Sequence, residues 1–492
     1  MSRSSGILLH ISSLPGKYGI GSLGCEARRF VGFLAETNQK LWQILPLGPT
    51  GYGNSPYQCY SAFAGNSIFI DLKDLVEDGL LDTEDLKQHP SFPEKRVDYD
   101  RVGEYKQELL KLAYQNFQEK FDHFKNEYYT FLGEHSWWLD DYALFRALKE
   151  SGEQKTWNGW TPDLKFRDEH ALQIQRHKLD QTIGFHRFLQ FIFFRQWFAL
   201  KKYANEKNVS ILGDIPLYIS YDSSDVWANQ DIFLLDKDGK PTLVGGVPPD
   251  YFSETGQLWG NPVYNWPRLK ERRYDWWIAR VHFNLRMFDL VRIDHFRGLE
   301  SFWTVPADEK TAIKGEWLPA GGNELLSILK KQLNHLPVIA EDLGVITPEV
   351  EKLRDDFQLP GMKILQFAFS SDETDKALPH HIERNSVVYT GTHDNDTSRG
   401  WYRNTGKKER SLLKQYMKMP GFRFSRRFIE MAWATVADRA LIPMQDLLGL
   451  DSSARMNVPG VASGNWEWRF RWKKLKKKHV RFLTEITRRY DR

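Results

Sequence analysis

The sequence contains 492 residues, enough for two or three domains or for one large barrel with insertions. Its 68 basic and 64 acidic residues leave a formal net charge of +4, so the total charge indicates no nucleic acid or other polyanionic partner. The two cysteines, Cys25 and Cys59, cannot staple a chain of this length, which favours a reducing, cytoplasmic compartment.

The first residues lead directly into the apolar stretch 7–10 without the hydrophobic core or cleavage site of a secretory signal. The most apolar helical stretch, residues 188–200, is interrupted by Gln190 and Arg195 and is too short to span a bilayer. We therefore expect neither a secretory signal nor a membrane span. The basic cluster at residues 471–479 is interpreted as the solvated face of a terminal helix, since no nucleic-acid-binding module accompanies it.

Short apolar runs that end in polar residues or in Gly/Pro turns recur along the chain. They cover residues 7–12, 41–46, 210–217, 289–294, 337–342, 361–368, 386–392 and about 432–443. Segments of helical period lie between most of them, and eight strands alternating with helices predict a (β/α)₈ TIM barrel. The last run ends near residue 443, which leaves no room for a C-terminal β-sandwich domain.

Two connections are too long to be simple crossover helices. Residues 65–205, after the second strand, are expected to form a helical insertion. Its amphipathic stretches are 105–119, 140–149 and 185–203. Residues 218–282, after the third strand, are rich in Gly, Pro and Trp and are expected to form an irregular lid insertion. We therefore predict a single catalytic barrel domain over residues 1–492 that carries both insertions.

The fourth apolar run carries an Arg-x-Asp pattern at its end. Arg292 and Asp294 are two residues apart and so lie on the same face of a strand, where the guanidinium can keep the carboxylate ionised. An ionised, immobilised carboxylate is a competent nucleophile. An ordinary structural ion pair within the strand is the alternative interpretation of these residues.

Two later stretches have the same design and favour the catalytic interpretation. Residues 337–344 and 386–396 are apolar strands that deliver carboxylates into turns bearing Gly or Asn. His393 alone could be a packing or capping histidine, but Thr392, Asn395 and Asp396 surround it with polar groups. The ends of parallel barrel strands are where such enzymes keep their chemistry, so three such ends predict an active site.

Together these stretches resemble the α-amylase clan, and most closely its amylomaltases, the 4-α-glucanotransferases or disproportionating enzymes of glycoside hydrolase family 77. The resemblance runs from about residue 7 to about residue 470. It implies that Asp294 is the nucleophile, Glu341 the acid/base and Asp394 the group that stabilises the transition state. Arg292 and His393 would be their partners.

Further residues are expected to bind the substrate or to position the site. Asp214 matches a conserved position of the clan and is expected to orient Arg292, while His295 is expected to line the substrate site. Within residues 53–57, which resemble the acceptor-side loop of the family, Ser55 and Tyr57 would face the glucan.

Residues 245–260 resemble the mobile loop of the family. Asp250, Glu254 and Trp259 are its expected substrate contacts, and glycines at both ends would act as hinges. A disordered insertion is the alternative, although this composition is a poor match for one. Asn465 matches a further contact of the family.

Retention of configuration needs two carboxyl groups about 5–5.5 Å apart, and neighbouring strand ends can supply this separation for Asp294 and Glu341. The implied activity transfers segments of α-1,4-glucans between maltooligosaccharides, or to glucose, with no metal and no organic cofactor. A retaining hydrolase, a metal-dependent enzyme and a non-catalytic glucan-binding protein remain alternatives. Arg292 would repel a metal ion, and a binding protein would not need all three carboxylates.

Overall fold

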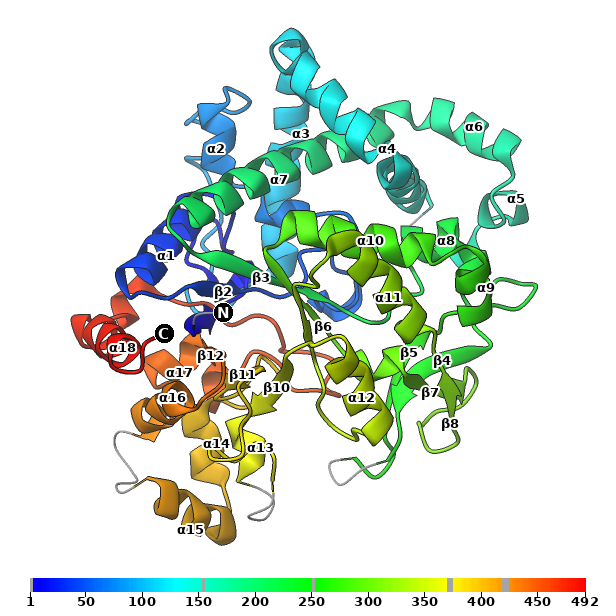
Figure 1. Cartoon of the computed structure of the whole chain (residues 1–492). Helices are drawn as coiled ribbons and strands as arrows, with labels where there is room; N and C mark the ends of the chain where they lie inside the picture. Colours follow the sequence, from blue (N-terminus) through cyan, green and yellow to red (C-terminus); the bar gives the residue numbers. More distant parts are fainter. Residues whose placement is uncertain (1–2, 153–154, 250–252, 370–374, 418–423) are drawn as a thin grey trace.

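The protein is described by a computed structural model that covers residues 3–152, 155–249, 253–369, 375–417 and 424–492. Eight parallel strands close into a barrel at its centre (Figure 1). In order around the barrel, the strands are β1 (Ser4–Leu8), β2 (Leu41–Gln43), β3 (Ser210–Ile215), β6 (Leu290–Ile293), β9 (Val338–Ala340), β10 (Gly361–Ile364), β11 (Ser386–Tyr389) and β12 (Arg439–Pro443). The predicted TIM barrel is therefore confirmed, and each predicted run contains or overlaps one strand.

The predicted runs and the observed strands differ in their bounds, and three of the runs differ most. The first strand begins at Ser4 and ends at Leu8, and a 3₁₀ turn at Ile11–Ser13 follows it. The sixth run divides into β10 and the short helix α13 (Leu365–Ala368). Most of the last run before residue 439 belongs to α16 (Phe424–Ala434) and to the connection after it. Short apolar runs do not separate a buried strand from a buried helix, which explains these errors.

The inside of the barrel changes from apolar to polar along the strands. Leu41, Leu212, Ile339, Met362, Ile364, Val387, Tyr389 and Leu441 form a separate interior cluster. Because side chains alternate along a strand, the residues two positions after Leu212 and Leu290 also point inward. These residues are Asp214 and Arg292, which are direct neighbours in the β3–β6 register, and Asp294 follows two residues after Arg292. The polar site is thus the uppermost layer of the barrel interior.

Helices precede most of the strands and cover the outside of the barrel. They are α1 (Cys25–Glu36), α7 (Asp180–Glu206), α10 (Asp275–Met287), α11 (Gly322–Leu333), α12 (Pro348–Asp356) and α16. Before α16 the chain forms α14 (Ser398–Asn404), which packs on α16, and α15 (Lys407–Tyr416). Outward-facing strand residues such as Ile7, Trp42 and Ile211 are fully buried beneath these helices in the main core. Pro348 occupies the first turn of α12, where its missing N–H is not needed.

Between β2 and β3 the chain forms a group of helices that lies above the barrel in Figure 1. They are α2 (Leu72–Glu77), α3 (Tyr99–Glu119), α4 (Phe121–Ser151), α5 (Pro162–Lys165), α6 (Glu169–Lys178) and α7. Asp98 begins α3 by accepting a hydrogen bond from the N–H of Arg101. Aromatic pairs such as Tyr128–Phe191 (5.4 Å) join α4 to α7. The predicted amphipathic stretches fall inside α3, α4 and α7, while the division of the chain at residues 65 and 205 stays a prediction.

A second sheet, which the sequence analysis did not anticipate, lies beside the barrel (Figure 1). It is antiparallel, in the order β5-β4-β7-β8. Its strands are β4 (Leu243–Val247), β5 (Gln257–Pro262), β7 (Ser301–Pro306) and β8 (Glu316–Pro319), and α8 (Ser224–Ala228) and α9 (Trp266–Glu271) flank β4 and β5 in the sequence. The segment 218–282 is therefore less irregular than expected. Of its two strands, β4 pairs with β7 of a hairpin that follows β6, a long-range pairing that local pattern does not reveal.

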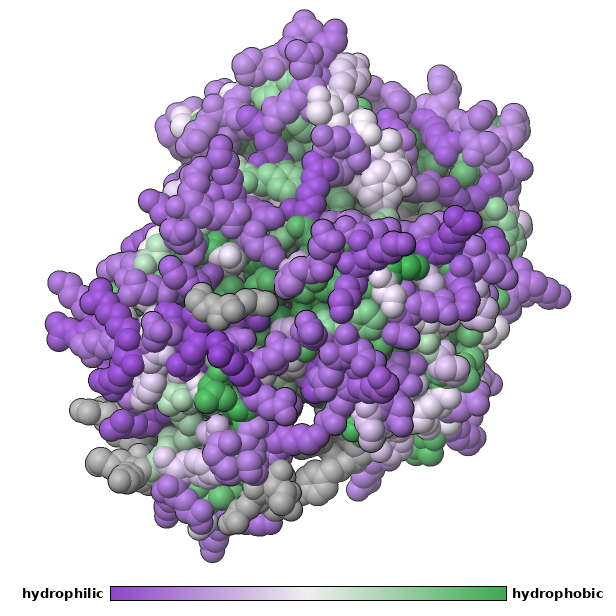
Figure 2. All heavy atoms as spheres, in the orientation of Figure 1, coloured by the Kyte–Doolittle hydropathy of each residue, from purple (hydrophilic) through white to green (hydrophobic). Residues whose placement is uncertain are grey.

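After β12 the chain forms α17 (Met444–Leu448), short 3₁₀ turns and α18 (Lys477–Arg489), and the described residues there contain no β-sandwich. The exposed residues Lys474, Lys476, Lys477 and Lys478 belong to the predicted basic cluster at the start of α18. On the face seen in Figure 2, hydrophilic residues predominate and hydrophobic ones lie mainly in recesses. Among the described residues, no helix is both long and apolar enough to cross a membrane.

Candidate active site

A buried arginine joins two carboxylates at the top of the barrel. Arg292 Nη1 donates to Asp294 Oδ1 at 2.9 Å, Nη2 donates to the same oxygen, and Nε lies 3.5 Å from Asp214 Oδ1. Burial by itself lowers the pKa of Arg292, but the charges of Asp214 and Asp294 raise it well above its ordinary value. A permanent cation therefore lies between the two carboxylates and donates two hydrogen bonds to Asp294.

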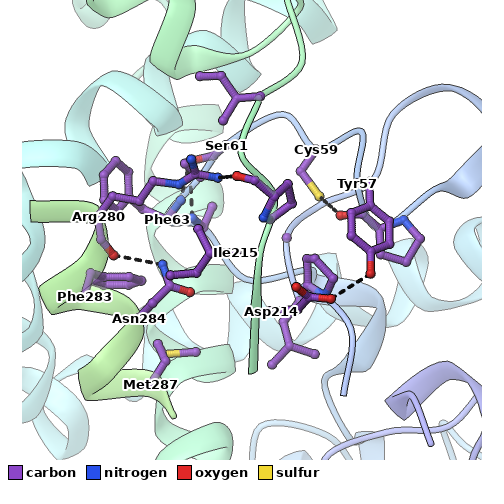
Figure 3. A pocket seen from close by; sticks show the side chains of 18 of the residues that line it. Tyr57, Cys59, Ser61, Phe63, Asp214, Ile215, Arg280, Phe283, Asn284 and Met287 are labelled. Carbon is purple, nitrogen blue, oxygen red and sulfur yellow. Dashed lines mark hydrogen bonds between the residues drawn. The ribbon is translucent and has the colours of Figure 1, made fainter. Parts of the chain in front are cut away.

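Asp214 is almost completely buried and has a second partner. Tyr57 donates its hydroxyl to Asp214 Oδ2 at 2.7 Å, as Figure 3 shows. Burial raises the pKa of the Asp214 carboxyl to about 7, although Arg292 opposes this shift. Asp214 thus lies beneath Asp294 and links the arginine to the loop after β2.

Glu341 follows β9 directly and lies beside Asp294. In the β6–β9 register Ile293 pairs with Ala340, which places these two carboxyl groups at equivalent positions of neighbouring strands. The backbone N–H of His295 donates to Glu341 Oε2 at 2.7 Å, and that of Leu343 donates to Oε1 at 3.1 Å. Burial, and then the charge of Asp294, raise the pKa of Glu341 well above its ordinary value, in spite of these donors. Glu341 therefore keeps its proton at a pH where an exposed carboxyl group loses it.

His295 has a backbone conformation that serves this arrangement. Its φ of 52° lies in the left-handed region, which a residue with a side chain adopts rarely and mostly at special turns. This turn lets its N–H reach Glu341, while its ring meets the edge of Trp259 at 4.8 Å. Burial lowers the pKa of His295 to about 3, so the imidazole is neutral, and its buried Nε2 has no hydrogen-bond partner among the described residues.

His393 and Asp394 follow β11 in a turn that is fixed by hydrogen bonds. Thr392 uses both its N–H and its hydroxyl to bind Asn395 Oδ1, at 2.8 and 2.9 Å. His393 Nε2 lies 3.4 Å from Asp394 Oδ2. Burial lowers the pKa of His393, so this contact is made by a neutral imidazole at neutral pH. The Asp394 side chain is 45% exposed and can reach a ligand.

The ring of Tyr57 also contacts the Asp394 side of the site. It stacks on His393 with 5.3 Å between ring centroids and an angle of 15°, and Trp466 lies 5.9 Å away. Because His393 and Trp466 cover part of the Tyr57 ring, only the remaining surface of the ring is available for the expected stacking on a sugar. Ser55 is adjacent, and its hydroxyl accepts a hydrogen bond from the N–H of Tyr57 at 3.3 Å.

A small cavity lies behind Tyr57 and Asp214, lined by Phe63, Ile215, Arg280 and other residues (Figure 3). Its volume of about 60 Å³ suits a few water molecules but is far below the roughly 300–1,000 Å³ of ligand pockets. Cys59 borders it and donates its thiol to the carbonyl of Pro56 at 3.0 Å. Burial raises the pKa of the Cys59 thiol to about 12, which makes it a packing residue and not a nucleophile.

Comparisons with known proteins agree with one another. Residues 9–475 match the sequence profile of the family described as 4-alpha-glucanotransferase, in glycoside hydrolase family 77. The chain belongs to this family. It is 49% identical to the 4-alpha-glucanotransferase of Synechocystis sp. over 98% of this chain and 97% of that one. It is 48% identical to the enzyme of Thermus thermophilus, over 99% of both chains. The amylomaltase of Streptococcus agalactiae, solved in complex with acarbose, is 41% identical and has a TM-score of 0.97, over 100% and 99% of the two chains.

The loop residues expected to bind glucan in this 4-alpha-glucanotransferase are placed less completely than the barrel residues. Trp259 is on β5 and faces His295, whereas Glu254 is exposed and Asp250 lies outside the described residues. Asn465 holds its own loop, because its Oδ1 accepts from the N–H of Val458 at 2.9 Å and its Nδ2 donates to the carbonyl of Val461 at 2.7 Å. Its contact with a sugar stays a prediction.

Three residues at the site were not predicted from the sequence. Asn457 and Arg455 both donate hydrogen bonds to Asp394, and Trp466 packs on His393 at 5.9 Å. They lie after the last barrel strand, where no strand-end pattern marks a position. The signal available was the run of residues 455–460, in which an Arg and an Asn precede a Pro-Gly turn.

Proposed function

We propose that this 4-α-glucanotransferase works by retaining double displacement, with Asp294 as the nucleophile and Glu341 as the acid/base. One observation carries the proposal: two neighbouring carboxyl groups are placed in opposite environments. Arg292 donates two hydrogen bonds to Asp294, whereas burial raises the pKa of Glu341. A pair of this kind supplies an anion and an acid at the same pH.

In the first step Asp294 attacks the anomeric carbon while Glu341 gives its proton to the glycosidic oxygen, and the leaving chain departs with a free hydroxyl group. This leaves a covalent glucosyl ester on Asp294 and an ionised Glu341. In the second step Glu341 takes the proton of an acceptor hydroxyl, which attacks the ester and releases Asp294. Asp394 binds ring hydroxyls as the sugar flattens, and Arg292, His393 and Asp214 keep the carboxylates in place.

The substrates under this proposal are α-1,4-glucans and maltooligosaccharides, with glucose or another glucan as the acceptor. Tyr57, Ser55, Asp250, Glu254, Trp259, His295 and Asn465 are proposed to contact the sugars. A retaining hydrolase would use the same catalytic residues, because water can replace the acceptor hydroxyl. Family membership favours transfer.

Product analysis on maltotriose tests the proposal. Transfer produces a ladder of longer glucans together with glucose, whereas hydrolysis produces only maltose and glucose. A product mixture without any glucan longer than maltotriose would exclude transfer for this substrate. Loss of the ladder in Asp294→Ala, with maltotriose binding retained, supports the assignment of the nucleophile.

The proposal includes no cofactor, since two carboxyl groups and a sugar complete both steps. It places the enzyme in the cytoplasm, and the two free cysteines, Cys25 and Cys59, fit a reducing compartment. Residues 65–205 and 218–282 are treated as insertions into one catalytic domain. Neither nucleic acid nor a membrane has a part in it.

A further inference from the structure

The Asp394 carboxylate has little support from the barrel itself. It lies on a turn beyond β11, 45% of its side chain is exposed, and its approach to His393 Nε2 is long, at 3.4 Å. Its short contact comes from a different part of the chain. Asn457 Nδ2 donates to Asp394 Oδ1 at 2.6 Å. Because a carboxylate only accepts hydrogen bonds, the amide must turn its NH₂ group towards Asp394.

Asn457 is itself fixed to the same turn. Its backbone N–H donates to the carbonyl of His393 at 3.1 Å. Arg455 binds both segments. Its Nη2 donates to the carbonyl of Asp394 at 2.5 Å, and its Nε donates to the carbonyl of Asn457 at 2.7 Å. Three hydrogen bonds therefore join residues 455–457 to residues 393–394, and only one of them reaches the carboxylate.

Residues 456–466, which include Asn457, form a loop whose two ends are joined by a hydrogen bond. The N–H of Trp466 donates to the carbonyl of Met456 at 2.8 Å, and Asn465 binds Val458 and Val461 between these ends. The Trp466 ring then packs on both His393 and Tyr57, at 5.9 Å from each. Asn457 is thus held at the base of a braced loop, which is the kind of support that keeps a catalytic side chain within a fraction of an ångström.

We propose that Asn457 is a positioning residue that aims the Asp394 carboxylate at the sugar. This inference rests on the proposed role of Asp394 in stabilising the transition state. A carboxylate has about four acceptor positions. Asn457 takes one of them and fixes the plane of the group, which leaves the others for the hydroxyl groups of the sugar. The benefit is realised as the ring flattens, so Asn457 acts on kcat more than on KM.

The test is a double-mutant cycle of Asn457→Ala and Asp394→Ala, measured with maltotriose and with α-glucosyl fluoride. Removing an outer partner of a catalytic group typically costs about 10–100-fold, which we expect in the kcat of Asn457→Ala, with KM changed less than about threefold. Both substrates should slow equally, since Asp394 acts on the ring and not on the leaving group. In the Asp394→Ala background the same change should cost less than about twofold.

A purely structural role gives different results. In that case Asn457→Ala lowers the melting temperature or the fraction of enzyme that forms the glucosyl ester. It also lowers kcat by the same factor in the Asp394→Ala background as in wild type. Asn457→Asp is the matched variant, because it keeps the size of the side chain but replaces the donor with an acceptor. It should lose more activity than Asn457→Ala.

A crystal structure of Asn457→Ala gives a second measurement, in which the Asp394 carboxylate should leave its native orientation. An unmoved carboxylate, kcat within about twofold of wild type, or an undiminished loss in the Asp394→Ala background would each overturn the inference. Wild-type activity of Asp394→Ala alone would instead remove the proposed role of Asp394, so the two failures are distinguishable.

Discussion

The groups proposed to cleave the bond and the groups proposed to choose the acceptor are held in different ways. Asp294 and Glu341 continue the main-chain ladder of neighbouring barrel strands, with Asp294 N–H bound to the carbonyl of Ile215 at 2.9 Å and Glu341 N–H to that of Ile293 at 3.1 Å. Tyr57 and Trp259 lie outside this ladder, on the connection after β2 and on β5 of the second sheet. The comparison suggests that the barrel sets the cleavage chemistry and that the connections set its outcome.

The strongest way to break this comparison is to remove Asp294, the proposed nucleophile. Asp294→Ala should lower kcat for maltotriose by more than about 10⁴-fold, because no covalent intermediate can form. Maltotriose binding, measured by calorimetry, should remain. Turnover near the wild-type rate would contradict the assignment.

Asp289 offers a matched control at the opposite end of the same strand. Its Oδ2 accepts hydrogen bonds from the N–H of Ile211 at 2.7 Å and from Asn205 at 2.9 Å, far from the polar layer. Asp289→Asn should keep kcat within about twofold and lower only the melting temperature, as expected for the stability face of a barrel. Equal kinetic losses at the two ends would mean that the strand, and not the carboxylate of Asp294, is needed.

The second prediction separates the acid from the nucleophile. General acid catalysis contributes about 10²–10⁴-fold, so Glu341→Gln should lose that much on maltotriose. α-Glucosyl fluoride needs little protonation of its leaving group and should form the glucosyl ester at a rate much closer to wild type. Burst kinetics with both substrates measure this difference. Equal losses for the two substrates would exclude Glu341 as the acid.

The positions of Asp294 and Glu341 could be predicted because each follows a short apolar run that ends in a carboxylate, a pattern visible within a few residues of sequence. The failures of the sequence analysis have a common physical cause. The hairpin of β7 and β8 joins the four-stranded sheet only because β7 pairs with β4, more than 50 residues earlier in the chain. Asn457 reaches Asp394 across 63 residues. Hydrogen bonds of this kind leave no periodic pattern in the sequence. The position of Tyr57 was predicted, but its stacking on His393 required the structure.

The third prediction concerns the connections. Transfer requires an acceptor sugar to be held near the glucosyl ester for longer than water occupies that place. Loss of an aromatic contact costs about 0.5–1.5 kcal/mol, so Tyr57→Ala and Trp259→Ala should each lower the ratio of transfer to hydrolysis about 2–13-fold. Total bond cleavage should fall less. Reducing ends and released glucose from maltotriose give both quantities.

Tyr57→Phe is the matched control for this prediction, since Tyr57 has two functions in the structure. The Phe variant keeps the ring on His393 but removes the hydrogen bond to Asp214. If the ring selects the acceptor, Tyr57→Phe retains the transfer ratio of wild type. If it loses as much of the ratio as Tyr57→Ala, the hydrogen bond beneath Asp294 is responsible, and the proposed separation between cleavage and acceptor choice is wrong at this residue.

The smallest effect is a stability difference at the strand end. Burial and the charge of Asp294 raise the folded-state pKa of Glu341 above 4.5, its ordinary value in the unfolded chain. Between these two pKa values the folded state binds more protons than the unfolded state, so the free energy of unfolding falls as pH rises. Below about pH 4 the carboxyl is protonated in both states and the effect is absent.

Glutamine cannot ionise, so Glu341→Gln should escape this loss of stability. Its melting temperature should exceed that of wild type by an amount that is smallest near pH 4 and grows as pH rises. Differential scanning calorimetry of both proteins from pH 4 upward measures this difference in melting temperature. The contributions of the other titrating groups are largely the same in both proteins and cancel in the difference. A difference that stays constant with pH would mean that the Glu341 site does not favour the protonated acid. The cleavage chemistry would then need another proton donor.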